Sequence, residues 1–385
     1  MRACFSIARG LFSLTLATDT GEDKVQRYRV VLWGPGQMGV GALRATIQHP
    51  GLELVGLVVH SEAKEGRDAG DLCGLPPTGI IATRDVDAAL QIDADAVAYF
   101  ASGDYRYREA AEDIARCLRA GRNVVTTSLV PFCYPPAAEP DLRTMLEDAC
   151  ATGGTTMFNS GVEPGWTNDI VPFVFSSTCA RIDRITMQEI LDYSPIAQPD
   201  IMYDFMGFAH PPERMTPLQE PGRLNALWSP VVWGLAAGLG LRLDRVDDTI
   251  EKWITPETYE TASGPLPAGT VGGMRFRLVG IADGEDRIVL EHITRMGAHS
   301  APDWPQHPSP LGGYRVILEG MPTYTVDIEM HGRGSNMRGL SYATFMRPLN
   351  AIPAVVAAAP GVVSAHDLPL VAGVMSGAEW TGIVA

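Results

Sequence analysis

Hydrophobic and polar positions along residues 28–160 alternate between short apolar runs and longer amphipathic stretches. Four runs read as buried parallel strands, namely Tyr28 to Trp33, Leu52 to His60, Ala94 to Ser102 and Asn123 to Ser128. Helices are predicted from Gly36 to about Gln48, and from Tyr107 to a terminating Gly121. This order predicts an α/β fold, a Rossmann-type doubly wound parallel sheet with its ligand at the carboxyl ends of the strands.

From Arg181 to Gly332 the period changes to two residues. Arg275 to Met296 reads as two strands around an Asp-Gly turn, and Thr323 to His331 places alternate apolar residues on one face. We expect a second, α+β domain on a mostly antiparallel sheet, open on one side. The Pro- and Gly-rich stretches Pro195 to Pro230 and Pro302 to Gly313 are predicted to be long loops.

These changes of pattern divide the chain into four segments. We expect a Rossmann domain over 28–160, a substrate and dimerisation domain over 161–340, and a C-terminal segment, 341–385, that returns to the Rossmann domain. Residues 1–27 have a basic start and an apolar stretch, but Ser and Thr interrupt it and no A-x-A site follows. We interpret them as a disordered extension rather than a signal peptide.

A Gly-rich turn follows the first strand. Gly34, Gly36 and Gly39 have the G-x-G-x-x-G spacing: the first allows a tight turn, the second lets a pyrophosphate approach the backbone, and the third lets helix and strand pack closely. The phosphate would meet the N–H groups of the helix that begins with Gln37 and Met38. The continuing strand–helix pattern makes this a dinucleotide site.

The end of the second strand bears on the choice between NAD and NADP. His60 and Ser61 stand where NAD enzymes carry an acidic residue, and Lys64 and Arg67 follow. This favours NADP, with NAD as the alternative if both cations face solvent or if Glu62 takes the acidic role.

Composition excludes several classes of protein. The 385 residues include 30 basic and 45 acidic side chains, and the net charge of −15 argues against nucleic-acid binding. No apolar run reaches the roughly 20 residues that a membrane helix needs. Six cysteines without C-x-x-C spacing read as free thiols of a cytoplasmic protein, and the eight histidines form no metal motif, so we expect no metal.

Four segments together resemble the NAD(P)-dependent reductases related to dihydrodipicolinate reductase, 2,4-diaminopentanoate dehydrogenase and the native amine dehydrogenases. They are "WGPGQMG" (33–39), "GRDAGDLCG" (66–74), "NSGVEPGWTND" (159–169) and "NAIPAVVAAAPGVVSAHDLP" (350–369). The resemblance implies an NAD(P)H-dependent oxidoreductase that transfers hydride to or from a C=N or C=O carbon of a small molecule. It also implies a homodimer formed through the antiparallel sheet.

Glu163 is the candidate catalytic residue, because a Pro- and Gly-rigidified turn presents it after a Rossmann-type strand. Burial would raise its pKa toward acid/base work, or as an anion it would hold a substrate ammonium. The alternative is that Glu163 caps a helix beginning near Trp166.

Other candidates follow from strand ends and the resembling segments. For the nicotinamide half of the cofactor we expect Ala101, Ser102, Thr127, Ser128 and, through the carboxamide, Asn350; for the substrate pocket we expect Trp166, Asn168, Asp192, Tyr193 and Phe208.

One departure from the resembling amine dehydrogenases leaves the chemistry open. Their strand resembling Asn123 to Thr127 is followed by a glutamate, whereas Ser128-Leu129-Val130-Pro131 lacks a carboxylate. Either Glu163 replaces that glutamate, or a different C=N or C=O substrate is reduced. A non-catalytic NADP-binding sensor is a further alternative. A carbonyl reductase without amine chemistry is another, although the Tyr-x-x-x-Lys pair of the short-chain type is missing.

Overall fold

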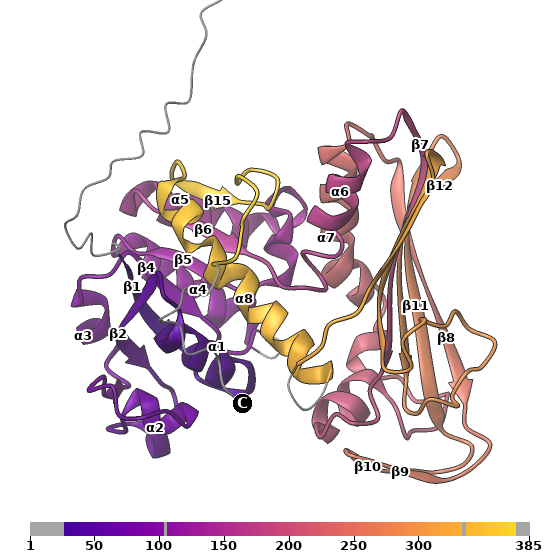
Figure 1. The fold of residues 1–385 in the computed structure, drawn as a ribbon, viewed down its shortest axis with the longest axis horizontal. Helices are drawn as coiled ribbons and strands as arrows, with labels where there is room; N and C mark the ends of the chain where they lie inside the picture. The colour runs from indigo at the N-terminus through magenta and orange to yellow at the C-terminus, as the bar shows by residue number, and fades with distance from the viewer. Residues whose placement is uncertain (1–26, 104–105, 333–335, 375–385) are drawn as a thin grey trace, which may run out of the picture.

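The computed structural model describes residues 27–103, 106–332 and 336–374. The disordered extension expected over 1–27 lies almost wholly outside this part of the chain. The described residues form two domains that lie side by side, with the C-terminal helix between them (Figure 1).

The N-terminal domain is built on a parallel sheet of seven strands in the order β15-β6-β5-β4-β1-β2-β3. Its central run, 3-2-1-4-5-6, is the Rossmann order, and all pairings within it are parallel. The strands are β1 (Tyr28–Trp33), β2 (Leu52–Val58), β3 (Ala82–Thr83), β4 (Ala96–Tyr99), β5 (Asn123–Thr126), β6 (Thr156–Asn159) and β15 (Gly361–Val363).

Helices cover both faces of this sheet, as buried apolar strands require. One apolar core lies under α3, α4 and α5, and the other lies under α1, α2 and α8. Their bounds are α1 (Gln37–Gln48), α2 (Ala69–Cys73), α3 (Val86–Gln91), α4 (Tyr107–Arg119), α5 (Pro140–Gly153) and α8 (Asn336–Ala357). The predicted Rossmann fold is confirmed; the first predicted strand matches β1, and the other three end two or three residues too late.

The second domain contains a six-stranded sheet in the order β14-β13-β7-β12-β11-β8. Only β7 and β12 are parallel, so the expected mostly antiparallel sheet is confirmed. The strands are β7 (Arg181–Asp192), β8 (Arg245–Ile254), β11 (Val271–Ala282), β12 (Glu285–Arg295), β13 (Gly312–Met321) and β14 (Tyr324–Ile328). Asp283 and Gly284 both have positive φ, which makes the β11–β12 turn type I′. A two-stranded ribbon, β9 (Tyr259–Thr261) and β10 (Gly264–Leu266), completes the strands.

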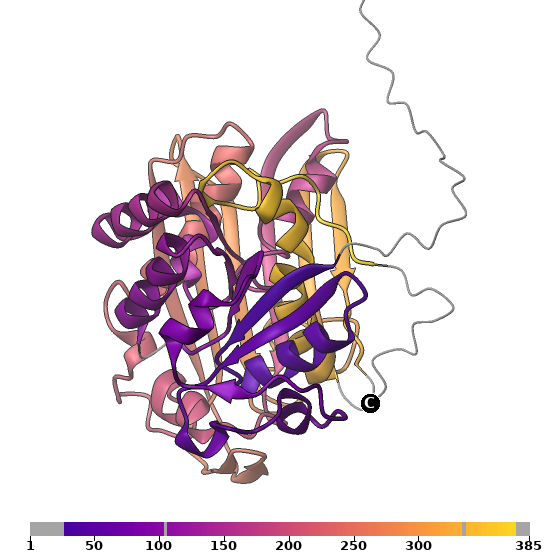
Figure 2. The same ribbon diagram turned by 90° about the vertical axis from the view of Figure 1, so that its left-hand side faces the viewer.

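Helices α6 (Ile170–Ser176) and α7 (Arg223–Gly238) pack between the two sheets. Figure 2, a view turned by 90°, shows the Rossmann domain in front of the six-stranded sheet, with α8 beside its strands. The expected loop from Pro195 to Pro230 is wrong in part: it contains a short π-helix over Asp200–Met206 and the beginning of α7. Pro230 lies inside α7, and its apolar neighbours are buried against the sheet, so tertiary packing overrides the Pro signal.

Candidate active site

The Gly-rich turn has the geometry of a phosphate cradle. Gly34 has φ +85°, and a Cβ there would lie 2.5 Å from the Ala101 nitrogen; a Cβ on Gly39 would lie 2.0 Å from the Gly34 carbonyl oxygen. A Cβ on Gly36 would meet nothing within 4 Å, and Gly36 caps α1. The space beside Gly36 is therefore open, and it adjoins the positive end of α1, where the first N–H groups, those of Gln37 and Met38 among them, have no partner within the helix. A dinucleotide pyrophosphate fits this cradle.

The loops after β4 and β5 meet beside the turn. Ser128 Oγ donates a hydrogen bond of 2.5 Å to the Ala101 carbonyl oxygen, and Ser128 N is 2.9 Å from Thr126 Oγ1. Ala101 in turn touches Gly34. The predicted residues Ala101, Ser102, Thr127 and Ser128 thus lie together at the carboxyl edge of the sheet, where the strand order reverses.

The residues after β2 surround the other side of the turn. Lys64 Nζ donates to the Pro35 carbonyl oxygen at 2.5 Å, so this cation lies on the Gly-rich turn itself. His60 Nε2 accepts from the Trp33 indole N–H at 3.1 Å. Ser61, Glu62 and Arg67 are exposed.

Asn350 does not join this group. Its Oδ1 lies 3.2 Å from His49 Nε2, and His49 caps the C-terminal end of α1. The 12-residue helix α1 separates that end from the Gly-rich turn by about 18 Å. The expected contact with the carboxamide is therefore wrong, and Asn350 fastens α8 to α1.

A cavity of about 320 Å³ opens between the Gly-rich turn and the six-stranded sheet. Met38, in the first turn of α1, marks its Rossmann side, and α8 supplies Leu340, Ser341 and Thr344. The rest of the lining combines apolar, aromatic and amide side chains with two carboxyl groups and one imidazole: Glu163, Glu189, Leu191, Tyr193, Ile196, Gln198, Ile201, Met202, Phe205, Met206, Leu218, Trp228, Phe276, His292 and Tyr314.

Glu163 reaches this cavity because the backbone after β6 turns sharply. Gly165 has φ +143°, and a Cβ there would lie 2.5 Å from the Gly161 carbonyl oxygen. Asn168 Oδ1 accepts from Gly165 N at 3.3 Å and closes the turn. Helix α6 begins only at Ile170 and is capped by Asp169, whose carboxylate accepts from Ile170 N. The alternative in which Glu163 caps a helix is therefore wrong.

Three ionisable side chains meet at the base of the cavity. One carboxylate oxygen of Glu163, one of Glu189 and one ring nitrogen of His292 all lie within 4.8 Å of one another. His292 Nε2 is 2.8 Å from Glu189 Oε1, the Tyr193 hydroxyl donates to the same oxygen at 2.6 Å, and the Trp228 indole N–H donates to Glu163 Oε2 at 3.3 Å. We call Glu163, Glu189 and His292 the carboxylate–imidazole cluster.

The three groups do not titrate alike. Burial raises the pKa of Glu163 to about 8, although the positive charge of His292 opposes that rise. Glu189 is also buried, but His292 and the tyrosine hydroxyls outweigh burial and hold its pKa below the usual value. Burial likewise disfavours charge on His292, and Glu189 overcomes it, so the His292 pKa is raised. These directions favour an ion pair of His292 with Glu189, beside a Glu163 that stays protonated up to a pH of about 8.

Sequence reasoning missed Glu189, His292 and Trp228. Glu189 and His292 are register partners on the parallel strands β7 and β12. Each is an ionisable residue between buried residues of its strand: Glu189 lies between Met187 and Leu191, and His292 lies between Leu290 and Thr294. An ionisable residue at a core-facing position of an alternating strand is the sequence signal that could have identified Glu189 and His292.

Some of the other residues predicted for the substrate pocket lie at the cavity, and others do not. Tyr193 lines the cavity, and Asn168 supports Glu163 from behind it. Trp166, Asp192 and Phe208 do not line it: Phe208 is fully buried in the core beneath the sheet, Trp166 packs against the same core, and the Asp192 carboxylate accepts from Ser194 N. Aromatic side chains at these positions serve packing.

Within the described part of the chain, the carboxylate–imidazole cluster is also the set of side chains that could hold a metal ion. Its closest atoms already form the His292–Glu189 ion pair, and Glu163 accepts from Trp228.

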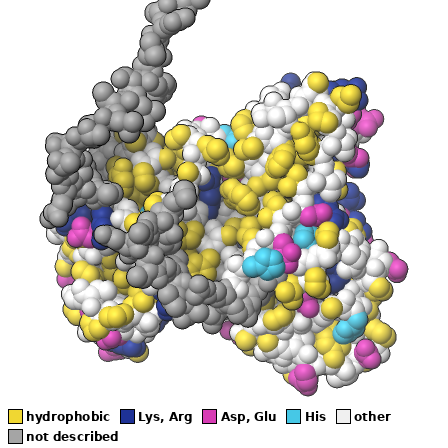
Figure 3. Space-filling model, in the orientation of Figure 1, with side chains coloured by type: hydrophobic (Ala, Val, Ile, Leu, Met, Phe, Trp, Pro, Cys, Tyr) yellow, Lys and Arg dark blue, Asp and Glu magenta, His cyan; other side chains and the backbone are white. Residues whose placement is uncertain are grey.

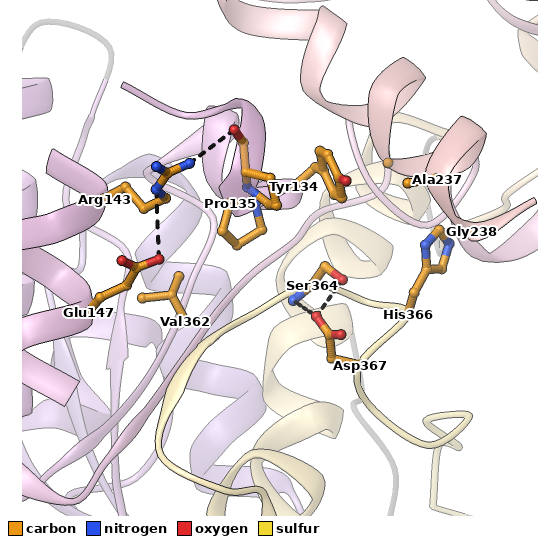
Figure 4. Close-up of a pocket in the computed structure, with 12 residues that line it drawn as sticks. Tyr134, Pro135, Arg143, Glu147, Ala237, Gly238, Val362, Ser364, His366 and Asp367 are labelled. Atoms are coloured by element: carbon orange, nitrogen blue, oxygen red, sulfur yellow. Dashed lines mark hydrogen bonds and ion pairs between the residues drawn. The ribbon is translucent and has the colours of Figure 1, made fainter. Parts of the chain in front are cut away.

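A larger cavity, of about 480 Å³, lies between α5, α7 and the chain after β15 (Figure 4). In its lining, Arg143 Nε lies 3.7 Å from Glu147 Oε1, and Asp367 Oδ2 accepts from both Ser364 N and Ser364 Oγ. It includes neither the Gly-rich turn nor the carboxylate–imidazole cluster, so we place the chemistry in the smaller cavity.

Known proteins match both domains. The family model "Dihydrodipicolinate reductase, N-terminus" matches residues 28–128, and the model "2,4-diaminopentanoate dehydrogenase C-terminal domain" matches residues 167–381. The chain is 40% identical to an amine dehydrogenase of Streptomyces virginiae, over 88% of this chain and 96% of that one. It is 23% identical to a 2,4-diaminopentanoate dehydrogenase of Acetoanaerobium sticklandii, over 91% and 96% of the two chains.

Among solved structures, an amine dehydrogenase from Mycobacterium smegmatis superposes with a TM-score of 0.70. It covers 91% of this chain and 98% of that one at 21% identity, which supports the fold. No helix of the described residues is long and apolar enough to cross a membrane. The relatives are dehydrogenases, which favours an enzyme over a sensor. With its dinucleotide cradle, this chain is an NAD(P)-dependent oxidoreductase and belongs to the family of the amine and 2,4-diaminopentanoate dehydrogenases.

Proposed function

We propose that the protein interconverts an amine and the corresponding carbonyl compound, using NAD(P) as the redox partner. The observation that carries this proposal is Glu163, a carboxyl group with a pKa near 8 in an apolar cavity beside the dinucleotide cradle. The balanced reaction is R₂CH–NH₃⁺ + NAD(P)⁺ + H₂O ⇌ R₂C=O + NH₄⁺ + NAD(P)H + H⁺. The relatives named amine dehydrogenase and diaminopentanoate dehydrogenase act on amines by name, which supports the same bond in this chain.

Glu163 has two tasks in the oxidative direction. Its ionised carboxylate attracts the substrate ammonium and then takes a proton from it, because only the neutral amine has the lone pair that expels hydride as a C=N bond forms. The bound nicotinamide supplies the hydride acceptor. Glu163 then releases this proton to solvent. Water must next add to the C=N carbon, and the ionised Glu163 would take the proton that this water loses. In the resembling enzymes a glutamate after β5 is proposed for this task; Ser128 stands there in this chain.

The His292–Glu189 ion pair has a supporting role. An uncompensated negative charge on Glu189 would repel the ionised form of Glu163. His292 Nε2, 2.8 Å from Glu189 Oε1, neutralises that charge. Phe276 stacks on the His292 ring, with ring centroids 4.6 Å apart and planes 7° apart, and fixes its orientation. The cluster therefore carries one free negative charge at most, which matches one substrate ammonium.

The cavity lining limits the substrate class. Lys and Arg are missing from the described residues that line it, so none of these lining side chains would pair with a substrate carboxylate. Leu191, Ile201, Met202, Leu218 and Phe276 present apolar surface instead. We expect amines with apolar substituents and no carboxylate, in contrast to the substrate named for the 23% identical relative.

The test is NAD(P)⁺ reduction with a panel of primary monoamines and with 2,4-diaminopentanoate. Wild-type protein should oxidise apolar monoamines in preference to the diamino acid. Glu163→Gln keeps the size and removes the charge, so kcat should fall about 10²- to 10⁴-fold.

Cofactor affinity of the Glu163→Gln variant, measured by calorimetry, is the control and should remain that of the wild type. Unchanged turnover would remove Glu163 from the chemistry. Activity only on carbonyl compounds, independent of ammonia, would favour a carbonyl reductase and contradict amine chemistry.

We also propose NADP as the preferred cofactor. Among the described residues after β2, His60 replaces the acidic residue typical of NAD enzymes, and Lys64 lies on the Gly-rich turn. Five described cysteines are free thiols, which supports a cytoplasmic location.

A homodimer is proposed through the face of the six-stranded sheet that is turned away from α7. This face carries the network of Gln188, Arg275 and Glu291: Arg275 Nε donates to Glu291 Oε1 at 2.8 Å, and Gln188 Nε2 donates to Glu291 Oε2 at 2.5 Å. In Figure 3 charged side chains of both signs gather along that side of the molecule. Light scattering should give twice the monomer mass, and Val279→Asp, on the same face, should halve it; a monomeric wild type would contradict the proposal.

A further inference from the structure

Five side chains gather at the ends of β1, β2 and β4, on the side of the sheet covered by α4. Trp33 ends β1 directly before the Gly-rich turn and is 1% exposed. Its ring lies 6.2 Å from that of His60 and 5.4 Å from that of Tyr99. Arg106, at the N-terminus of α4, and Asp113 complete the group.

The indole of Trp33 determines which nitrogen of His60 carries the proton. An indole N–H only donates, so His60 Nε2, 3.1 Å away, must be the acceptor. The neutral His60 ring then carries its proton on Nδ1, which is a donor. Aspartate or glutamate, the usual residues at this strand end, accept the ribose 2′-hydroxyl; His60 offers a donor in their place.

Arg106 adds positive charge to the same spot. Partial burial of the ring and then the nearby Arg106 lower the pKa of His60, which keeps the ring neutral at physiological pH. Arg106 Nη2 lies 4.0 Å from Asp113 Oδ2, and the same Asp113 oxygen accepts from the Tyr99 hydroxyl at 3.0 Å. Asp113 is thus occupied on the α4 side, and the guanidinium keeps donors for another oxyanion.

We propose that Arg106 and His60 bind the adenosine 2′-phosphate of NADP(H), and that Trp33 is a positioning residue that fixes His60 as the donor. This rests on the dinucleotide binding of the proposed function and identifies its specificity-determining residues. Lys64 is engaged with Pro35 on the turn, where it is closer to the pyrophosphate cradle. A phosphate accepts from both groups and neutralises the guanidinium, whereas a ribose hydroxyl accepts a hydrogen bond but leaves the guanidinium charge uncompensated.

The test uses two adenosine fragments, 2′,5′-ADP and 5′-AMP, titrated into the protein by calorimetry without any turnover. Wild type should bind 2′,5′-ADP more tightly. Arg106→Gln should lower that preference about 10- to 100-fold, because a hydrogen-bonded charge is lost. Arg108→Gln is the matched control, since Arg108 lies on the same helix and pairs with Asp141, and it should leave the preference unchanged.

Trp33→Phe keeps an aromatic ring and removes the indole N–H. It should lower the preference about three- to tenfold, and ¹⁵N NMR of His60 should show a mixture of tautomers. Because Trp33 is buried, His60→Leu is the second variant; His60 is exposed, so the fold should tolerate it. Equal affinity of the wild type for both fragments, or a preference untouched by Arg106→Gln and His60→Leu, would overturn the proposal. Absence of amine oxidation bears only on the proposed function.

Discussion

The dinucleotide cradle and the carboxylate–imidazole cluster lie on opposite sides of one cavity but are built in opposite ways. The cradle is formed by the backbone of Gly34, Gly36 and Gly39, which are close in sequence. Each position requires that no side chain be present. The cluster is side chains on three elements, with Glu163 in a turn, Glu189 on β7 and His292 on β12. A local backbone site tolerates little change, whereas a side-chain cluster can be tuned by substituting one partner at a time.

The largest effect is expected in the cradle. Gly36→Val should abolish cofactor binding while the protein folds, because a side chain at Gly36 meets no protein atom but fills the space a pyrophosphate needs. Calorimetry with NADPH and a thermal melt measure the two properties. Gly36→Ala is the graded control and should weaken binding less. A folded Gly36→Val protein with wild-type affinity would place the cradle elsewhere.

Substitutions in the carboxylate–imidazole cluster should shift the pH dependence of activity rather than abolish activity. In the oxidative direction Glu163 must be ionised, so kcat/KM should rise with pH through about 8. Glu189→Gln should move that limb to higher pH. Without Glu189, buried His292 loses its charge, and of the two charged neighbours His292 has the larger influence on the Glu163 pKa.

Activity of Glu189→Gln at pH 7 should fall about tenfold for each unit of that shift, and return at high pH. Tyr193→Phe, which removes one hydrogen bond to Glu189, is the milder control. A pH profile of Glu189→Gln that superposes on that of the wild type would show that the His292–Glu189 ion pair does not influence the pKa of Glu163.

A smaller effect concerns stability. The folded-state pKa of Glu163 is raised, so its contribution is fully present below the unfolded value near 4.5 and is lost as pH rises through about 8. Gln cannot ionise. The Tm of Glu163→Gln relative to wild type should therefore increase between pH 6 and pH 9. A constant difference in Tm would contradict the raised pKa.

The smallest effect is expected from the cations after β2. Arg67 is exposed and Lys64 is engaged with Pro35, so neutralising both as Lys64→Gln and Arg67→Gln should weaken NADPH only about two- to fivefold. NADH affinity is the reference. A loss greater than that of Arg106→Gln would move the 2′-phosphate site to the cations.

The two regions also differ in how far sequence predicts them. Strand β1, the glycines and α1 follow from local periodicity and from backbone constraints within about one dozen residues, so their positions could be predicted. Glu163 could be predicted because its turn is local as well. His292 faces Glu189 only because β12 pairs with β7 in parallel register, and nothing near either residue specifies that pairing. The prediction that Asn350 contacts the carboxamide was wrong for the same reason, because the direction in which α8 crosses α1 depends on tertiary packing.

The last strand, β15, lies at the edge of the first domain. Thr156 Oγ1 donates to the Ala359 carbonyl oxygen at 3.1 Å, across 203 positions of sequence, and Gly361 pairs with Thr156 on β6. During synthesis, β6 therefore has a bare edge until the whole second domain has emerged, and bare edges invite pairing with other chains. The same return brings α8 to the cavity wall. An unfinished chain would hold a cofactor cradle without a substrate cavity, so catalytic competence arrives only with the final segment of the described fold.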